Sequence, residues 1–287
     1  MNLIIGSSGK IGTYYKFFSK LKNNIYTSHN KNVKNILKFD LAKDNILDLY
    51  KKYNFRNAVL FSSISNPEYC EKNKRLSYKI NIKYTKKIID FLVKKNIYFI
   101  FFSTEYVYFG KKKIFYNEDS QTNSKQLYAN QKIEIEKYIY KKKYINFSIL
   151  RLSKTFGDQI KDSTLFSSTL SSYLNGQKIF YIASDQFFKP LFVKDLVKII
   201  DIFLKKNIKG VYNVCGDKYI SRFNLIKFFF KYKKIKDVKL YKISINDIKN
   251  NIFYPKYLNL DNTKIKKVTK FNFTKIKDVY KKLCINL

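Results

Sequence analysis

A tyrosine and a lysine, Tyr128 and Lys132, stand four residues apart at the start of a segment with helical periodicity. Residues at i and i+4 share one helical face, so the phenol and the ammonium should lie side by side. A tyrosine phenol has a pKa of about 10 in model peptides, and a nearby ammonium favours its anion. The pair could therefore exchange a proton with a carbonyl oxygen. With 25 tyrosines and many lysines in the chain, the spacing alone is weak evidence.

A hydroxyl side chain, Thr104, stands close behind an apolar segment that we expect to be a buried strand, residues 98–102. In an open α/β sheet, the carboxyl ends of the strands face the ligand-binding crevice. The helix that begins near Tyr128 follows this strand in the chain. We therefore expect Thr104, Tyr128 and Lys132 to belong to one site.

Three of the eight glycines lie near the N-terminus, between an apolar segment at 3–5 and an amphipathic segment at 11–21. Gly6 permits a tight exit from a strand, Gly9 lets the backbone approach a pyrophosphate, and Gly12 allows close helix–strand packing. A helix N-terminus adds N–H donors for an anion. We therefore predict a dinucleotide-binding turn formed by Gly6, Ser8, Gly9, Lys10, Ile11 and Gly12.

The segment at the end of the second expected strand, residues 26–31, contains no acid. In NAD-binding folds, an Asp or Glu at this place accepts a hydrogen bond from the ribose 2′-hydroxyl. The segment instead offers hydroxyls, Asn30 and a cation, which favours NADPH or the use of both cofactors.

Short apolar segments with strand character alternate with longer amphipathic segments in the first half of the chain. The expected strands are 3–5, 25–27, 58–61, 98–102 and 147–150, and the expected helices are 11–21, 76–93 and 128–140. Continuous apolar strands separated by amphipathic helices indicate a mostly parallel sheet covered on both faces, the doubly wound α/β (Rossmann) fold.

The alternation becomes less regular after about residue 155, where helices are expected at 165–174, 193–204 and 223–232. We therefore expect an NAD(P)-binding Rossmann domain at 1–155 and a smaller α/β substrate lobe at 156–287. Residues from about 192 to 215 should return to the Rossmann domain, with 210–214 as a further strand of its sheet.

The formal net charge of +37 raises the alternative of a polyanion-binding protein. Only four of the 58 Lys and Arg residues are Arg, the residue preferred for reading bases and clamping phosphates. The lysines are spread along the whole chain, which favours a solvated surface over a nucleic-acid site. The positive electrostatic field of the protein should still attract a nucleotide diphosphate.

The three cysteines, Cys70, Cys215 and Cys284, are far apart, which argues against a disulfide framework and against a metal site. The single histidine, His29, lies in a polar segment, so histidine-based catalysis is nearly excluded. The longest apolar segments are far shorter than the ~20 residues that span a bilayer. The N-terminus lacks a signal-peptide pattern, so we expect a cytoplasmic protein.

These segments together resemble the extended short-chain dehydrogenase/reductases, most closely the dTDP-4-dehydrorhamnose reductase branch. The resemblance runs over nearly the full length and lies in the order of many short motifs. The motifs are GSSGKIG (6–12), Asn81 after SYKI, STEYVYFG (103–110), YANQK (128–132), LRLSKTFG (150–157), DQFFKPLFVKDL (185–196), GVYNVCG (210–216) and YPKYLNLDNTKIKK (254–267).

The resemblance implies that Tyr128 donates a proton to the substrate carbonyl oxygen. It also implies that Lys132 lowers the pKa of Tyr128 and holds the nicotinamide ribose, while Thr104 hydrogen-bonds the carbonyl or Tyr128. Hydride would pass from NADPH or NADH to the C4 ketone of a nucleotide-linked sugar. The further cofactor contacts implied are Asp40, Leu41, Ser62, Ser63 and Ile64, and the substrate contacts are Ser103, Thr104, Glu105, Tyr106 and Ser153. No metal ligand is predicted, and a homodimer is one candidate assembly.

The sequence departs from the family pattern at four of these positions. Phe109 replaces an aspartate and Tyr254 an arginine, which bears on the identity of the sugar more than on the reaction class. Ala129 and Gln131 replace the Gly and Ser of Y-G-x-S-K, where neither side chain does the chemistry. Two alternatives share the fold: a sugar-nucleotide epimerase or dehydratase that retains NAD, and a non-catalytic dinucleotide-binding regulatory subunit. The presence of Thr104, Tyr128 and Lys132 and the absence of an acid at 26–31 favour the reductase.

Overall fold

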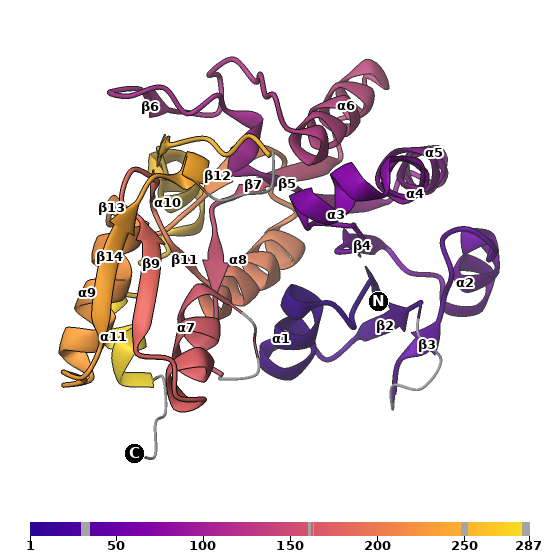
Figure 1. Ribbon diagram of the computed structural model, residues 1–287. Coiled ribbons are helices and arrows are strands. Elements are labelled where there is room, and N and C mark those ends of the chain that lie inside the picture. The colour runs from indigo at the N-terminus through magenta and orange to yellow at the C-terminus, as the bar shows by residue number, and fades with distance from the viewer. Residues whose placement is uncertain (30–34, 160–161, 163, 248–251, 283–287) are drawn as a thin grey trace.

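A parallel sheet forms the centre of the computed structural model, which describes residues 1–29, 35–159, 162, 164–247 and 252–282 (Figure 1). Its seven strands follow the order β12-β7-β5-β4-β1-β2-β3, and every neighbouring pair is parallel. The strands are β12 (Gly210–Val214), β7 (Phe147–Leu152), β5 (Tyr98–Thr104), β4 (Asn57–Leu60), β1 (Asn2–Ile5), β2 (Asn24–Ser28) and β3 (Leu37–Lys38). The expected doubly wound α/β fold is confirmed. The strand order reverses between β1 and β4, the place where such sheets bind ligands.

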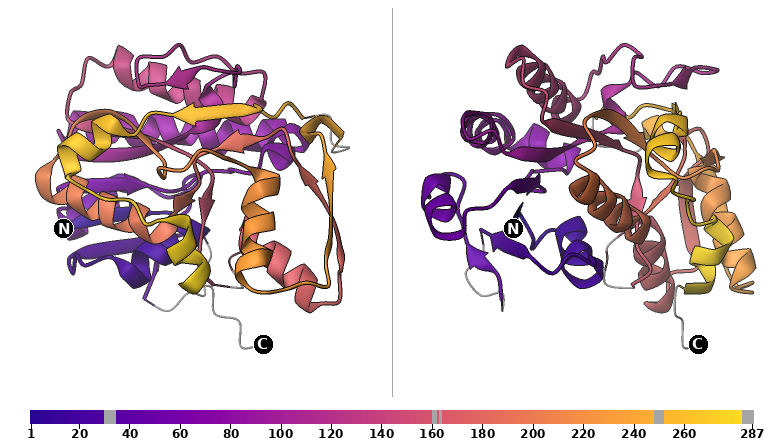
Figure 2. Two further views of the ribbon diagram at one scale, coloured as in Figure 1. Left: turned by 90° about the vertical axis from the view of Figure 1, so that its left-hand side faces the viewer. Right: turned by 180° about the vertical axis from the view of Figure 1, so that it is seen from behind.

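Alternating apolar side chains bury both faces of the sheet. Leu3 and Ile5 of β1 pack with α2 (Ile46–Tyr53), α5 (Thr85–Lys94) and α6 (Leu127–Lys141). The residue between them, Ile4, faces the opposite cluster, which includes side chains of α1 (Lys10–Phe18) and α8 (Val193–Lys206). Figures 1 and 2 show these two groups of helices on opposite sides of the sheet. This alternation explains why the strands read as continuous apolar segments.

The helix expected at 76–93 is interrupted. Helix α4 (Lys74–Tyr78) passes into a π-helical turn, η1 (Lys79–Tyr84), before α5 begins. The Thr85 hydroxyl bonds the carbonyl of Ile80 at 2.9 Å, and Asn81 in the turn is 3% exposed with its amide fully engaged. The helical segment expected near 76–93 is therefore present, and a hydrophobic period of 3.6 residues could not reveal the wider turn within it. Such turns often occur at functional sites.

The smaller lobe surrounds its own apolar cluster, which is rich in phenylalanine and includes Phe166, Phe229 and Phe230. A four-stranded sheet joins β13 (Ile220–Ser221), β10 (Phe187–Phe188), β15 (Tyr257–Leu260) and β6 (Phe115–Tyr116). Two further pairs are β8 (Thr155–Phe156) with β11 (Leu191–Phe192), and β9 (Ile179–Ala183) with β14 (Lys239–Ile243). The remaining helical elements are α3 (Pro67–Lys72), η2 (Glu105–Val107), α7 (Leu165–Leu174), α9 (Arg222–Tyr232), η4 (Ile245–Asp247), α10 (Thr263–Thr269) and α11 (Ile276–Lys282).

Two segments connect the lobe with the main sheet. Strand β12 returns to the sheet beside β7, and β6, from the first half of the chain, pairs with β15 of the lobe. The chain thus contributes strands across the expected domain boundary in both directions. The boundary at residue 155 stays a prediction. Within the described ranges, every helix is too short or too polar to span a bilayer.

Candidate active site

A cleft of about 550 Å³ lies at the carboxyl ends of β1, β4, β5 and β7. It brings together residues that the sequence analysis predicted from widely separated segments. The predicted residues that line it are Gly6, Gly9, Lys10, Ile11, Gly12, Ser63, Ser103, Thr104, Glu105, Tyr106, Tyr128, Lys132 and Ser153. The glycine turn and the three proposed catalytic side chains therefore share one cleft.

The glycine turn connects β1 to α1 at one wall of the cleft. Gly6 has φ +91°, in the left-handed region that favours glycine, and its N–H donates to the Thr27 carbonyl at 3.1 Å. A Cβ on Gly12 would lie 2.7 Å from the Gly6 carbonyl oxygen, so only glycine lets the helix pack so closely. A Cβ on Gly9 would meet only that oxygen, at 3.6 Å. Gly9 therefore leaves its surface toward the cleft open.

Tyr128 and Lys132 lie in the first turns of α6, and both are more than nine-tenths buried. The Lys132 Nζ lies 5.7 Å from the centre of the Tyr128 ring and 4.8 Å from that of Phe101. Burial lowers the pKa of Lys132 to about 8. Burial also raises the pKa of the Tyr128 phenol, opposite to the lowering expected from Lys132, because loss of solvent around the phenolate dominates. The phenol is therefore held in its protonated, donating form.

The end of β5 supplies a row of polar groups. The Thr104 Oγ1 accepts a hydrogen bond from the Tyr106 N–H at 3.3 Å, at the start of η2. The buried Ser103 hydroxyl has no hydrogen-bond partner among the described residues. The Glu105 carboxylate accepts from the Ser153 hydroxyl at 2.6 Å and from the Lys154 N–H at 3.0 Å. Glu105 therefore ties the end of β5 to the end of β7, and burial raises its pKa to about 7.

Some predicted cofactor residues lie outside the lining of the cleft: Ser8, Asp40, Leu41, Ser62 and Ile64. The Ser8 hydroxyl bonds that of Ser28 at 2.6 Å, and the Asp40 carboxylate accepts from the Ala42 N–H at 2.8 Å. The Ser62 N–H donates to the Ile5 carbonyl at 3.0 Å, which fixes the exit of β4 against β1. Asn30 lies outside the described residues. The ligand contacts of all six remain predictions.

Tyr254, whose departure from the family pattern was linked to the sugar, also lines the cleft. Nine further lining residues were not predicted: Phe61, Ser65, Asn66, Pro67, Glu68, Phe102, Leu152, Lys154 and Thr155. Most directly adjoin predicted ones, so the order along the chain could have indicated them. Lys154 stands inside the LRLSKTFG motif, and burial, Arg222 and Lys10 lower its pKa to about 7. Tyr254 comes from the distant lobe, and its ring meets that of Tyr106 edge-on at 6.2 Å.

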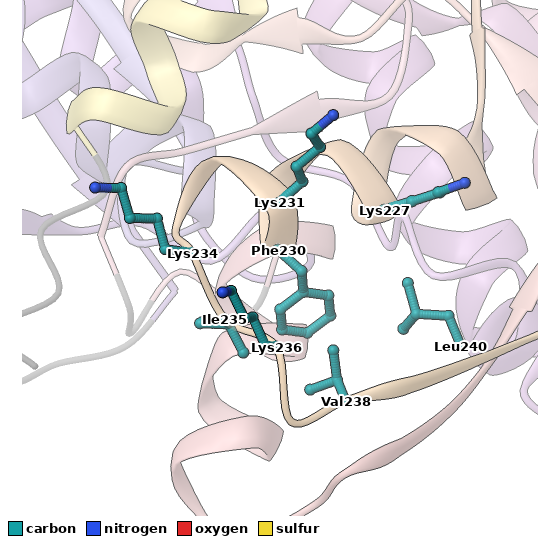
Figure 3. Close-up of a pocket in the computed structure, with 8 residues that line it drawn as sticks. All are labelled: Lys227, Phe230, Lys231, Lys234, Ile235, Lys236, Val238 and Leu240. Carbon is teal, nitrogen blue, oxygen red and sulfur yellow. The ribbon is translucent and has the colours of Figure 1, made fainter.

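The described residues include no group of three or more His, Cys, Asp or Glu side chains that could hold a metal ion. A hollow of about 380 Å³ lies beside the end of α9 and the start of β14, with Phe230, Val238 and Leu240 among its lining residues. Figure 3 shows Lys227, Lys231 and Lys234 pointing away from these apolar side chains. No hydroxyl or carboxyl side chain lines this hollow, so it offers none of the predicted proton-transfer groups.

A family model described as the RmlD substrate binding domain matches residues 1–285. The chain belongs to this family. The resemblance seen in the short motifs is thereby confirmed. No curated protein sequence matches the chain.

Solved structures of related enzymes share the fold at low sequence identity. One is a dTDP-4-dehydrorhamnose reductase from Bacillus anthracis in complex with NADP, with a TM-score of 0.82 and 18% identity over 98% of this chain and 97% of that chain. A dTDP-4-dehydrorhamnose reductase from Yersinia enterocolitica has a TM-score of 0.84 and 15% identity, with 99% of both chains covered. A UDP-N-acetylglucosamine 4-epimerase from Methanobrevibacter ruminantium has a TM-score of 0.82 and 18% identity over 98% and 96%. At these identities the likeness shows the fold alone.

Proposed function

We propose that the protein is an NAD(P)H-dependent reductase of a nucleotide-linked 4-keto sugar, similar to dTDP-4-dehydrorhamnose reductase. Its product would serve the synthesis of deoxysugar or surface polysaccharide precursors. The observation that carries the proposal is the meeting of Thr104, Tyr128 and Lys132 with the glycine turn in one cleft. The family match over residues 1–285 and the NADP-bound reductase of the same fold support it.

The residues at the glycine turn fit a dinucleotide. Gly9 offers open surface, the N-terminus of α1 begins at Lys10, and both line the cleft. Backbone N–H groups at a helix N-terminus and a nearby ammonium are suited to a pyrophosphate. Ser63, across the cleft, and Lys132 would hold the nicotinamide end. When bound, the nicotinamide would supply the hydride.

The proton would come from Tyr128. Its raised pKa keeps the phenol protonated at neutral pH, so it can donate to the carbonyl oxygen of the sugar. The Thr104 hydroxyl, at the end of β5, would donate a hydrogen bond to the same oxygen. The Lys132 ammonium would stabilise the tyrosinate that remains after the proton has passed to the sugar.

Cations outnumber carboxylates in the lining of the cleft, which holds Lys10, Lys132 and Lys154 against Glu68 and Glu105. Lys10 and Lys154 line it, and the charge of Arg222 acts on Lys154. The carboxylate of Glu105 is already bonded to Ser153 and to the backbone of Lys154. A nucleotide diphosphate would offset this positive charge, in agreement with a sugar nucleotide as the substrate class.

The leading alternative is an epimerase that retains NAD, supported by an epimerase of the same fold. A turnover screen separates the two. The purified protein is incubated with NADPH or NADH and a panel of dTDP- and UDP-linked 4-keto sugars, and absorbance at the nicotinamide band is followed. A parallel panel holds the corresponding 4-hydroxy sugars, which are the substrates of a 4-epimerase. A reductase oxidises added cofactor in proportion to sugar consumed. Interconversion of sugars without net oxidation would favour the epimerase, and no turnover of any panel member would contradict the proposal.

A further inference from the structure

Asn81 fixes the loop that follows β4. Asn81 is a buried residue of the π-helical turn η1, and its Oδ1 accepts from the Ile64 N–H at 2.8 Å and from the Ser63 hydroxyl at 3.1 Å. Its Nδ2 donates to the Ile64 carbonyl at 3.0 Å. One amide therefore satisfies both backbone groups of Ile64 and holds Ser63, which lines the cleft.

Gln131 connects this amide to the helix that carries the proposed catalytic pair. Its Oε1 accepts from Asn81 Nδ2 at 2.7 Å, and its Nε2 donates to the Ser77 hydroxyl of α4 at 3.0 Å. Gln131 is 4% exposed and stands directly before Lys132 on α6, yet it is not part of the cleft lining. Its amide points to the back of the site and bonds two elements at once.

We propose that Gln131 is a positioning residue that sets the distance between the loop at Ser63 and the catalytic pair on α6. The inference rests on the proposed function and deepens it, since these two walls would hold the same dinucleotide from opposite sides. A serine, which the family resemblance places here, is too short to bond Asn81 and Ser77 together. This chain therefore uses a longer amide in place of the family residue.

The physical reason is burial. Each of these hydrogen bonds joins groups withdrawn from water, so loss of the Gln131 amide leaves Asn81 Nδ2 with a missing acceptor. The Cys70 Sγ, 3.9 Å from Asn81 Nδ2, is a weak acceptor, so Asn81 recovers a full partner by turning away from Ile64 or by letting water in. Either change moves the loop that lines the cleft. A shift of about 1 Å at such a wall is enough to impair binding and turnover.

The test compares Gln131→Leu, which keeps the size of the side chain, with Asn130→Leu, an exposed neighbour on the same helix. The dissociation constant of NADPH is measured by fluorescence, kcat and KM by turnover, and Tm by thermal unfolding. We expect Gln131→Leu to weaken NADPH binding about tenfold and to lower kcat, with Asn130→Leu close to the parent protein. A Gln131→Leu protein with a lowered Tm but parental dissociation constant and kcat would overturn the inference.

A double-mutant cycle with Asn81→Ala adds a readout that a purely structural role would not move. If Gln131 acts through Asn81, the double variant should bind NADPH no more than about threefold worse than the poorer single variant. If the losses of NADPH affinity in the two single variants instead multiply in the double variant, the inference is contradicted. Should Gln131→Leu fail to fold, Ser77→Ala removes only one anchor of the Gln131 amide and should weaken binding in the same direction. Unchanged NADPH binding in that variant would overturn the inference.

The two proposals fail separately. If the parent protein turns over no keto sugar, the proposed function is contradicted, while direct NADPH binding still tests the role of Gln131.

Discussion

The Nζ atom of Lys132 lies 5.7 Å from the centre of the Tyr128 ring, one helical turn along α6. Both side chains are buried in the wall of the cleft, and burial moves their pKa values in opposite directions. The phenol keeps its proton to higher pH than usual, and the ammonium loses its proton at lower pH. Near neutral pH, both groups therefore carry a proton.

The pH dependence of kcat/KM should report Lys132. Its pKa is lowered to about 8 in the free protein, and the free protein is the state to which kcat/KM refers. We expect kcat/KM to fall as the pH rises through about 8, because the ammonium is lost while Tyr128 is still protonated. The measurement is a pH–rate profile from pH 6 to pH 10 for the parent protein and Lys132→Met. A profile that stays flat to pH 10 would exclude a functional role for this ammonium.

The glycine turn offers a matched pair of variants. Gly9→Ala should fold with a Tm near that of the parent, because its Cβ meets only one atom at ordinary contact distance. It should nevertheless weaken NADPH binding by about tenfold or more, since the methyl group occupies the surface where we place the pyrophosphate. Gly12→Ala should lower stability by about 1–3 kcal/mol through overpacking against Gly6 and Ser7.

Thermal unfolding with and without NADPH distinguishes the two glycine variants. Parental NADPH affinity in Gly9→Ala would show that the dinucleotide does not approach the turn. Parental stability in Gly12→Ala would contradict the packing argument.

The segments that sequence predicted well are those in which one local pattern determines the structure. Continuous apolar segments predicted the strands, and the spacing of the glycines predicted the turn. Both features are determined by residues that are neighbours in the chain. Tyr254 approaches the cleft from the smaller lobe, and no local pattern indicates that its ring meets Tyr106.

Other features depended on burial and could not be predicted from spacing. The four-residue interval placed Tyr128 beside Lys132, but the spacing could not reveal the burial of the phenol, which raises its pKa. The contact of Gln131 with Asn81 was missed because it is a tertiary contact between α6 and η1. The π-helical turn was missed because one wider turn leaves no mark in the hydrophobic spacing.

Glu105 should make stability depend on pH. Its pKa rises from 4.5 to about 7 on burial, so the folded protein binds this proton more tightly than the unfolded chain. The stabilisation is complete below pH 4.5 and is lost as the pH rises through about 7, for a loss of about 3 kcal/mol by pH 8. Glu105→Gln is neutral at every pH and should lack this loss.

Urea unfolding at pH 5 and pH 8 measures the effect of Glu105. The stability of the parent relative to Glu105→Gln should fall between the two pH values. Glu134→Gln, a partly exposed carboxyl paired with Lys86, is the control and should show little change. Equal pH dependence in the parent and Glu105→Gln would contradict the assignment.

The most direct test of the central claim is the Tyr128→Phe variant, assayed for NAD(P)H oxidation with the keto sugar that the parent protein reduces. NADPH binding and Tm should stay within about twofold and a few degrees of the parent, because the ring still fills its place in α6. Turnover should fall by about a hundredfold or more, since the phenol proposed as the proton donor is removed. Parental kcat in a folded, cofactor-binding Tyr128→Phe protein would contradict the account.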